Sequence, residues 1–271
     1  MKVRMQLIVL LVVCLIMPVG VVAQDNNEKY NQFDDQGHRQ GIWYSYFRDG
    51  GLRYEGRFAD DKPVGVFYYY FPEGGLRAEL IHDSEESEYD EAVKATFYHK
   101  NREISSEGFY VNEERHGTWR YFNERGHLIS ENYYHHGEDH GVWKVYYSSG
   151  TVAEIKTFHY GARHGEWERY FENGKLNFVT VFEDDKLNGK YEVYNASGRV
   201  RVKGHYTNNQ PDKRWVFYTA GGHRQREVIY KDGEIVRETI HIEVEDSDEP
   251  IRPGDKPFTE EELRRFGMHG W

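Results

Sequence analysis

Cysteine is almost missing from this chain of 271 residues. Its one cysteine, Cys14, lies within an apolar run close to the N-terminus, residues 7–23. A chain with a single cysteine forms no internal disulfide and no zinc site made of several thiolates. Stability must therefore come from packing.

Positive charge is also scarce, because 35 Lys and Arg residues face 46 Asp and Glu residues, a formal net charge of −11. An acidic surface repels the phosphates of nucleic acids and the headgroups of anionic membranes. The composition therefore argues against a nucleic-acid partner and makes lipid binding unfavourable.

Long apolar runs are absent except for residues 7–23, which follow Lys2 and Arg4 and end in Val21-Val22-Ala23. This order is typical of a secretory signal peptide, with cleavage after Ala23. Cleavage would remove Cys14 and two positive charges, which lowers the formal charge by two, to −13. We expect an exported protein, periplasmic or secreted.

What the chain has instead is a repeat. An aromatic residue, here called the marker, recurs at one fixed spacing, except for one longer gap between Phe67 and Trp119. The markers are Trp43, Phe67, Trp119, Trp143, Trp167, Tyr191 and Trp215. The gap between Phe67 and Trp119 holds a degenerate copy around Ala95–Tyr98, with extra residues in the acidic run before it. Self-similarity at a period such as that from Trp119 to Trp143 is the signature of a repeat array, here of about eight units over residues 41–236.

Glycines keep the same phase two positions before the marker, as at Gly117, and seven after it, as at Gly126. The second set follows turn-forming residues, as in Glu172-Asn173-Gly174, which is typical of hairpin connections. Between the turns lie short segments rich in aromatic and β-branched residues. We predict an all-β fold, an elongated single-layer antiparallel sheet of tandem β-hairpins.

The run YEGRFADDKPVG, Tyr54–Gly65, resembles the membrane occupation and recognition nexus (MORN) repeat. The pair Gly-x-Trp, as in Gly117-Thr118-Trp119, is similar to the variant repeat of the YwqK-type antitoxin family and of exported bacterial proteins. The resemblance implies a twisted sheet used as a scaffold or protein-binding surface, with neutralisation of a partner as the antitoxin-like role. Lipid binding, attributed to some members, is disfavoured here by the acidic balance.

The predicted contacts are the marker aromatics and their in-phase neighbours, although a one-layer sheet must also use large rings for its core. An alternative function is a cell-surface glycan- or choline-binding module that uses exposed rings. The candidate binding residues are Trp43, Tyr46, Tyr70, Trp119, Phe122, Trp143, Tyr146, Trp167, Tyr170, Trp215 and Tyr218.

A histidine precedes the repeat glycine in three units, at His116, His140 and His164. Adjacent units would place these rings about 9–10 Å apart, too far to share one ion. We therefore predict no metal site and no cofactor at this position of the repeat.

Catalysis finds little support in the sequence. There is no Gly-x-Ser-x-Gly elbow, no phosphate loop and no His-Glu-x-x-His motif. Carboxylates such as Glu183-Asp184-Asp185 fall in predicted turns, and each polar position is echoed in the next unit, unlike a single convergent active site. The chain is predicted not to be an enzyme.

The segments outside the array are residues 24–40, which are polar, and residues 237–271. The latter are expected to add a strand, then an acidic linker and a short helix from Thr259. This tail either covers part of the array or docks a partner.

Overall fold

The computed structural model describes residues 29–82 and 91–242, which form strands and turns throughout. The 19 strands follow one another in chain order through one sheet, paired antiparallel, and β9 pairs with both β10 and β11. The result is one open sheet, as predicted. The strands are β1 Gln32–Phe33, β2 Arg39–Tyr46, β3 Leu52–Ala59, β4 Lys62–Tyr70, β5 Leu76–Ile81, β6 Val93–Tyr98, β7 Ile104–Val111, β8 Glu114–Phe122, β9 Leu128–His135, β10 Glu138–Asp139, β11 Gly141–Tyr146, β12 Val152–His159, β13 Ala162–Tyr170, β14 Leu176–Glu183, β15 Lys186–Tyr194, β16 Val200–Thr207, β17 Gln210–Tyr218, β18 Arg224–Lys231 and β19 Glu234–Ile240.

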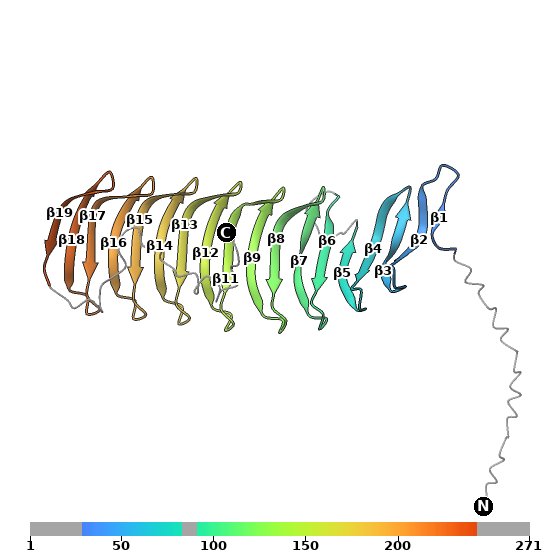
Figure 1. The fold of residues 1–271 in the computed structure, drawn as a ribbon, viewed down its shortest axis with the longest axis horizontal. Helices are drawn as coiled ribbons and strands as arrows, with labels where there is room; N and C mark the ends of the chain where they lie inside the picture. Colours follow the sequence, from blue (N-terminus) through green and yellow to red (C-terminus); the bar gives the residue numbers. More distant parts are fainter. Residues whose placement is uncertain (1–28, 83–90, 243–271) are drawn as a thin grey trace, which may run out of the picture.

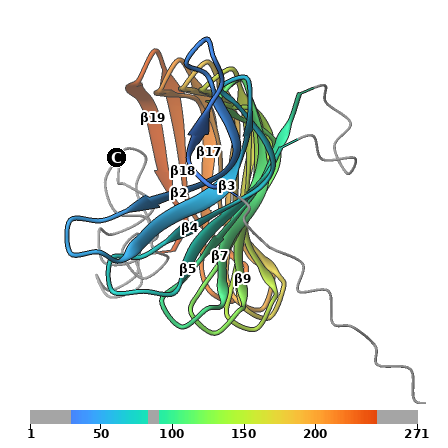
Figure 2. The same cartoon turned by 90° about the vertical axis from the view of Figure 1, so that its right-hand side faces the viewer.

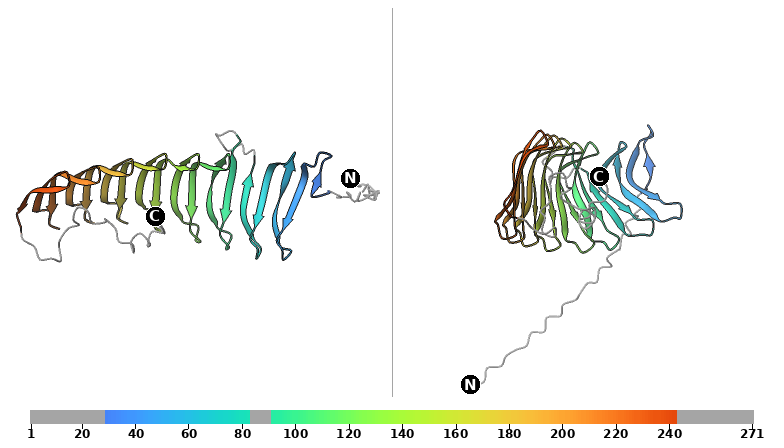
Figure 3. Two further views of the ribbon diagram at one scale, coloured as in Figure 1. Left: turned by 45° about the horizontal axis from the view of Figure 1, so that its top comes forward. Right: turned by 60° about the vertical axis from the view of Figure 1, so that its left-hand side comes forward.

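The sheet is long and one layer thick (Figure 1). Its strands cross the long axis, and a view along that axis shows them bending across the width of the sheet (Figure 2). Short turns follow one another along both long edges (Figure 3). Each strand therefore contacts mainly its two neighbours in sequence, as expected of a repeat array.

One long edge, here called the interunit edge, carries the turns that lead from one repeat unit to the next. Several are two-residue turns in which both residues have positive φ, such as Asp60-Asp61 (50° and 64°) and Asn208-Asn209 (49° and 67°). This is the type I′ geometry, whose twist matches that of the flanking strands. The turn chemistry fixes the hairpin register along this edge.

The glycine two positions before the marker explains a recurrent irregularity. Gly117, Gly165 and Gly189 have φ of 68°, 97° and 139°, and the pairing register shifts beside this position in each unit. Lys213 holds the equivalent place at φ 62°, a conformation that is unfavourable for a residue with a side chain.

The two faces of the sheet differ sharply in composition. The core face carries the marker residues and an aromatic from the strand that follows each marker, including Phe67, Trp119, Tyr206 and Trp215, all buried. The polar face carries the residues one before and one or three after each marker. The hydrophobic core is thus a thin band of rings along one side.

The degenerate third unit keeps the register although it lacks a ring at the marker position. Ala95 pairs with Leu80 and with Gly108 and is fully buried. The strand before it, β5, is shortened and ends at Ile81. A methyl group therefore replaces the marker ring without breaking the sheet.

The sheet extends beyond the predicted array, residues 41–236, at both ends: β1 and the start of β2 precede it, and β19 continues past it to Ile240. The predicted signal peptide, acidic linker and C-terminal helix lie outside the described residues. No helix able to cross a membrane occurs in the part of the chain that the structure describes.

Candidate functional site

The rings of the core face form a ladder that runs from unit to unit. The ring of Trp215 lies 5.3 Å from that of Tyr191, 5.1 Å from Tyr206 and 6.1 Å from Tyr230. Similar contacts join Tyr110 to Trp119 at 4.9 Å. Most of these rings meet edge to face, the arrangement that their quadrupoles favour.

Cationic side chains lie over this ladder. The guanidinium of Arg39 is 3.8 Å from the centroid of Phe58, and that of Arg163 is 4.4 Å from Phe182. Both arginines also donate from Nε to a turn carboxylate, Arg39 to Asp61 at 2.8 Å and Arg163 to Asp185 at 2.7 Å. These hydrogen bonds lower the pKa of both aspartates. The repeat thus covers its rings with its own arginines.

The predicted tryptophan contacts belong to this core. Trp119 and Trp215 are 1% and 0% exposed, while Trp43, Trp143 and Trp167 are half-buried. The indole N–H of Trp119 donates to the carbonyl of Phe109 at 3.0 Å, and that of Trp215 donates to the carbonyl of His205 at 3.1 Å. Packing and hydrogen bonding therefore explain Trp119 and Trp215 without a ligand.

The other predicted contacts lie on the opposite, polar face, three positions after each marker. Tyr46 is 55% exposed and the rest of the row is half-buried. Two members, Tyr98 and Tyr194, are absent from the predicted contacts, although the same repeat phase identifies them. The complete row, here called the tyrosine row, is Tyr46, Tyr70, Tyr98, Phe122, Tyr146, Tyr170, Tyr194 and Tyr218.

Four hydroxyls of the tyrosine row donate to glutamates on the same face. Tyr146 donates to Glu131 at 2.6 Å and Tyr170 to Glu168 at 2.7 Å. The same bond joins Tyr70 to Glu55 and Tyr194 to Glu192. Burial, together with this hydrogen bond and the neighbouring negative charge, raises the pKa of each of the four tyrosines to about 12. The row is held in place by its acceptors.

Ion pairs continue this pattern along the polar face. Arg120 Nε donates to Glu131 at 3.1 Å, and its Nη1 lies 3.6 Å from Glu107. Near the other end, Arg214 Nη2 lies 2.6 Å from Glu227. The face is therefore polar and charged, with aromatic side chains at regular intervals.

Two open hollows lie on the sheet. One, of about 430 Å³, is lined by Thr118, Arg120, Glu131, Tyr133, Gly141, Val142 and Lys144. The other, of about 420 Å³, is lined by Tyr46, Phe47, Arg48, Arg53, Tyr69, Tyr70 and Arg77. The second hollow combines aromatic rings with three cationic side chains.

A buried charge cluster lies on the core face between the fifth and sixth units. Glu154 is 2% exposed and accepts a hydrogen bond of 2.6 Å from the indole of Trp167. Lys156 Nζ lies 3.0 Å from the same carboxylate, and Arg169 Nε lies 3.4 Å from it. Here the marker tryptophan bonds a carboxylate instead of a backbone carbonyl.

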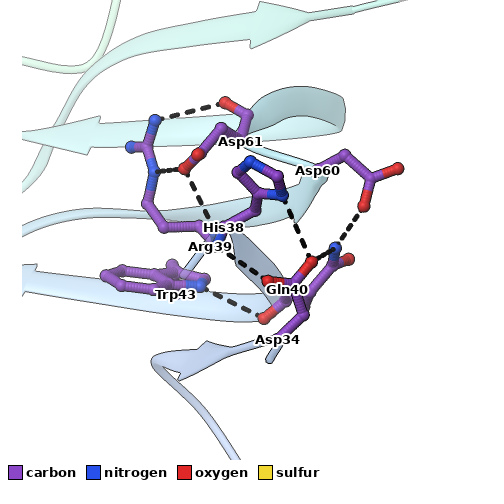
Figure 4. Close-up of polar contacts among 7 residues, drawn as sticks. All are labelled: Asp34, His38, Arg39, Gln40, Trp43, Asp60 and Asp61. Atoms are coloured by element: carbon purple, nitrogen blue, oxygen red, sulfur yellow. Dashed lines mark hydrogen bonds and ion pairs between the residues drawn. The ribbon is translucent and has the colours of Figure 1, made fainter. Parts of the chain in front are cut away.

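A polar cluster closes the N-terminal end of the sheet (Figure 4). Asp34 accepts the backbone N–H groups of Gln36 and His38, both at 2.9 Å, and its Oδ2 lies 3.3 Å from His38 Nδ1. Gln40 bridges Asp34 and Asp60. Asp34, His38 and Asp60 are close enough to hold a metal ion, but both oxygens of Asp34 already have partners, Oδ1 in the turn backbone and Oδ2 in the side chains of Gln40 and His38. The cluster acts as a cap for the first hairpin.

The three predicted histidines lie in separate units along the interunit edge. Other histidines stand between them, with ring centroids 5.1 Å apart for His116 and His135 and 5.5 Å apart for His140 and His159. Sequence reasoning missed these intervening rings because it followed one position of the repeat. The sequence did contain a signal for them: His135 and His159 occupy the same position of the repeat, at the end of the strand that follows each marker strand.

Five segments of the chain match the family model described as MORN repeat variant, namely residues 39–60, 115–136, 139–160, 163–184 and 187–208. Each covers a strand with its marker, the following turn and strand, and the turn of the interunit edge. Five tandem segments of the chain are therefore similar to the MORN repeat variant. A comparison with curated proteins finds no match.

Solved structures with similar chains include the crystal structure of TcdB2-TccC3-Cdc42 (10% identity, 75% of this chain and 13% of that chain, TM-score 0.21). The Photorhabdus luminescens Tc holotoxin pore is another (11% identity, 74% and 13% covered, TM-score 0.19). The chain spans about 13% of the length of these chains.

Proposed function

We propose that this protein is a non-catalytic, exported scaffold that binds a protein partner along its polar face. The observation that carries the proposal is the tyrosine row, which offers a ring in every unit on the face that lacks the aromatic core. The core face, by contrast, is filled by its own rings and covered by arginines such as Arg39 and Arg163.

The composition of the polar face suits a protein surface. Tyrosine and arginine are enriched in protein interfaces, because they bury large area while keeping a polar group for hydrogen bonding. Cations on the face, among them Arg120, Lys144 and Lys203, alternate with a similar number of carboxylates, so a partner surface of mixed charge would complement it. These carboxylates are Glu55, Glu79, Glu107, Glu131, Glu166, Glu168, Glu192 and Glu227.

An antitoxin-like role, in which the scaffold neutralises its partner by covering it, is the form of this function that the Gly-x-Trp repeat favours. The MORN-variant matches support a binding scaffold in general. Export rests on the leader-like residues 1–23. Absence of catalysis rests on the repetition of every polar position, which leaves no single convergent site.

The test begins with affinity capture of the partner from the envelope proteins of the producing cell. The purified partner is then titrated against the wild-type chain and a variant with Tyr46→Ala, Tyr146→Ala and Tyr170→Ala. We expect at least about tenfold weaker binding, since interface tyrosines are frequent hot spots. Tyr160→Ala is the matched control, because Tyr160 is also 55% exposed but lies at the interunit edge. Equal affinity of the row variant and wild type would refute the proposal.

A glycan-binding module is the second candidate, and the hollow lined by Tyr46, Tyr69 and Tyr70 favours it. Arg53 and Arg77 in the same hollow favour an anionic glycan over choline, whose charge they would repel. Calorimetry with an acidic cell-wall glycan should then show heat that is lost in the Arg53→Ala, Arg77→Ala variant. Heat from choline instead would argue for a quaternary-ammonium ligand.

A further inference from the structure

A row of histidines on the interunit edge spans three units. His116 begins it in β8, and His135 and His136 follow at the end of β9 and in the next turn. His140, His159 and His164 continue it, with neighbouring ring centroids 5.5–5.7 Å apart. Imidazole is a favoured ligand of zinc, copper and nickel ions.

Only the first part of this row converges. Nitrogen atoms of His116, His135 and His136 lie within 4.8 Å of one another, one from each ring. Their ring centroids are 4.5–5.1 Å apart. A tetrahedral zinc ion with Zn–N bonds near 2.0–2.1 Å places its ligand atoms about 3.4 Å apart. The three rings therefore need a closure of about 1.4 Å at most, which side-chain rotation can supply.

Partners around these rings prepare them for coordination. His136 is exposed, and its Nδ1 lies 3.8 Å from Glu114 Oε2, which leaves Nε2 for an ion. A carboxylate behind a ligating imidazole is a common outer shell of metal sites, because it orients the ring and increases its basicity. His116 is 7% exposed, and its Nδ1 accepts a long 3.4 Å bond from the backbone N–H of His136. An ion bound at this nitrogen would replace that long hydrogen bond.

The repeat contains its own comparison sites at the same three positions. Moving along by one repeat unit replaces His116, His135 and His136 with His140, His159 and Tyr160. Moving again gives His164, Glu183 and Asp184. The number of imidazoles falls from three to two to one, while the backbone stays alike. His136 and Tyr160 have φ of 48° and 47° in equivalent turns.

We propose that His116, His135 and His136 form a binding site for one divalent transition-metal ion of the zinc class. Bound there, the ion ties β8 to the turn that follows β9, and so braces the end of the fourth unit. Magnesium does not suit the site, because it prefers a shell of oxygen ligands. The site lies at the interunit edge, away from the tyrosine row, and does not depend on the proposed partner.

The test is calorimetry of the chain, purified without a histidine tag, with ZnCl₂ and with MgCl₂. We expect one equivalent of zinc and no heat from magnesium. His136→Tyr should weaken zinc binding by at least about tenfold. This variant should fold, because Tyr160 already occupies the equivalent turn. His164→Ala is the matched control and should keep the wild-type affinity.

Cobalt gives an independent signal, because a visible absorption band reports nitrogen ligands around the ion. That band should appear with the wild-type chain and be lost in His136→Tyr. A second zinc equivalent in Tyr160→His would support the same geometry one unit further on. The proposal is overturned if wild-type protein shows no zinc heat, or if His136→Tyr binds zinc as tightly as wild type.

Discussion

Gly204 lies against the indole of Trp215 so closely that a Cβ at Gly204 would be 2.2 Å from Trp215 Cδ2. Gly56 stands in the same relation to Phe67 and Gly108 to Trp119, with distances of 2.3 and 2.5 Å. The ring of one unit therefore packs onto a glycine of the unit before it. This contact couples neighbouring hairpins.

Gly204→Ala is therefore expected to destabilise the sheet by about 1–3 kcal/mol, because the added methyl group overpacks a ring that cannot move aside. Chemical denaturation followed by tryptophan fluorescence measures the change. Gly221→Ala is the control, since the nearest atom to its Cβ would be 3.4 Å away on the side chain of His223. A loss at Gly204 no larger than at Gly221 would contradict the packing argument.

Lys213→Gly should stabilise the protein. Lys213 has φ of 62° at a position where other units have glycine, and a left-handed conformation costs a residue with a side chain about 1–2 kcal/mol. Part of this gain is offset by the greater backbone entropy of glycine when unfolded, so we expect a net increase of about 0.5–1 kcal/mol in the free energy of unfolding. Lys231→Gly, at a regular strand position paired with Glu234, should lower it instead.

Glu154→Ala should cost about 3–5 kcal/mol, because it removes the carboxylate that Lys156 and Arg169 contact inside the core face. Thermal unfolding of the variant measures the loss. Glu166→Ala removes a glutamate paired with Lys190 at an exposed site and should cost about 0–1 kcal/mol. Similar losses in the two variants would show that burial of the cluster contributes little.

Alkaline titration should show late ionisation of the four tyrosines that donate to glutamates. Tyr70, Tyr146, Tyr170 and Tyr194 have pKa values raised to about 12 from an ordinary value of 10.0. Between these values the folded chain holds more protons than the unfolded chain, so stability falls as pH rises from about 10 to 12. Phenolate absorbance should rise late for these groups. In Glu131→Gln, Tyr146 should ionise at lower pH than in wild type.

Much of the fold could be predicted because turn formation is local. Glycines in phase after the markers predicted the hairpin turns, as at Gly126, while the bulge at the glycine before each ring, as at Gly117, emerged from the strand pairing. Side chains along each strand alternate between the two faces of the sheet. Which rings are buried could not be decided in this way, because it depends on the neighbouring unit. Trp215 is fully buried partly because Gly204 leaves space for its indole.

The histidine cluster escaped prediction for a related reason. The prediction compared His116 with His140, which occupy the same position in successive units. The close contacts instead join different positions of one unit, His116 with His135 and His136. His135 reaches His116 because β9 lies beside β8, and His136 follows in the adjoining turn. Only strand pairing brings these positions together.

The pairing of two strands per unit has a consequence for whatever binds the polar face. Strands lie about 4.8 Å apart, so equivalent side chains recur about every 10 Å along the molecule. A ligand that contacts the whole tyrosine row must present complementary groups at the same spacing. A compact ligand can contact only a few neighbouring units. The length of the sheet therefore favours elongated or periodic ligands. Each additional hairpin lengthens the binding face by one repeat unit.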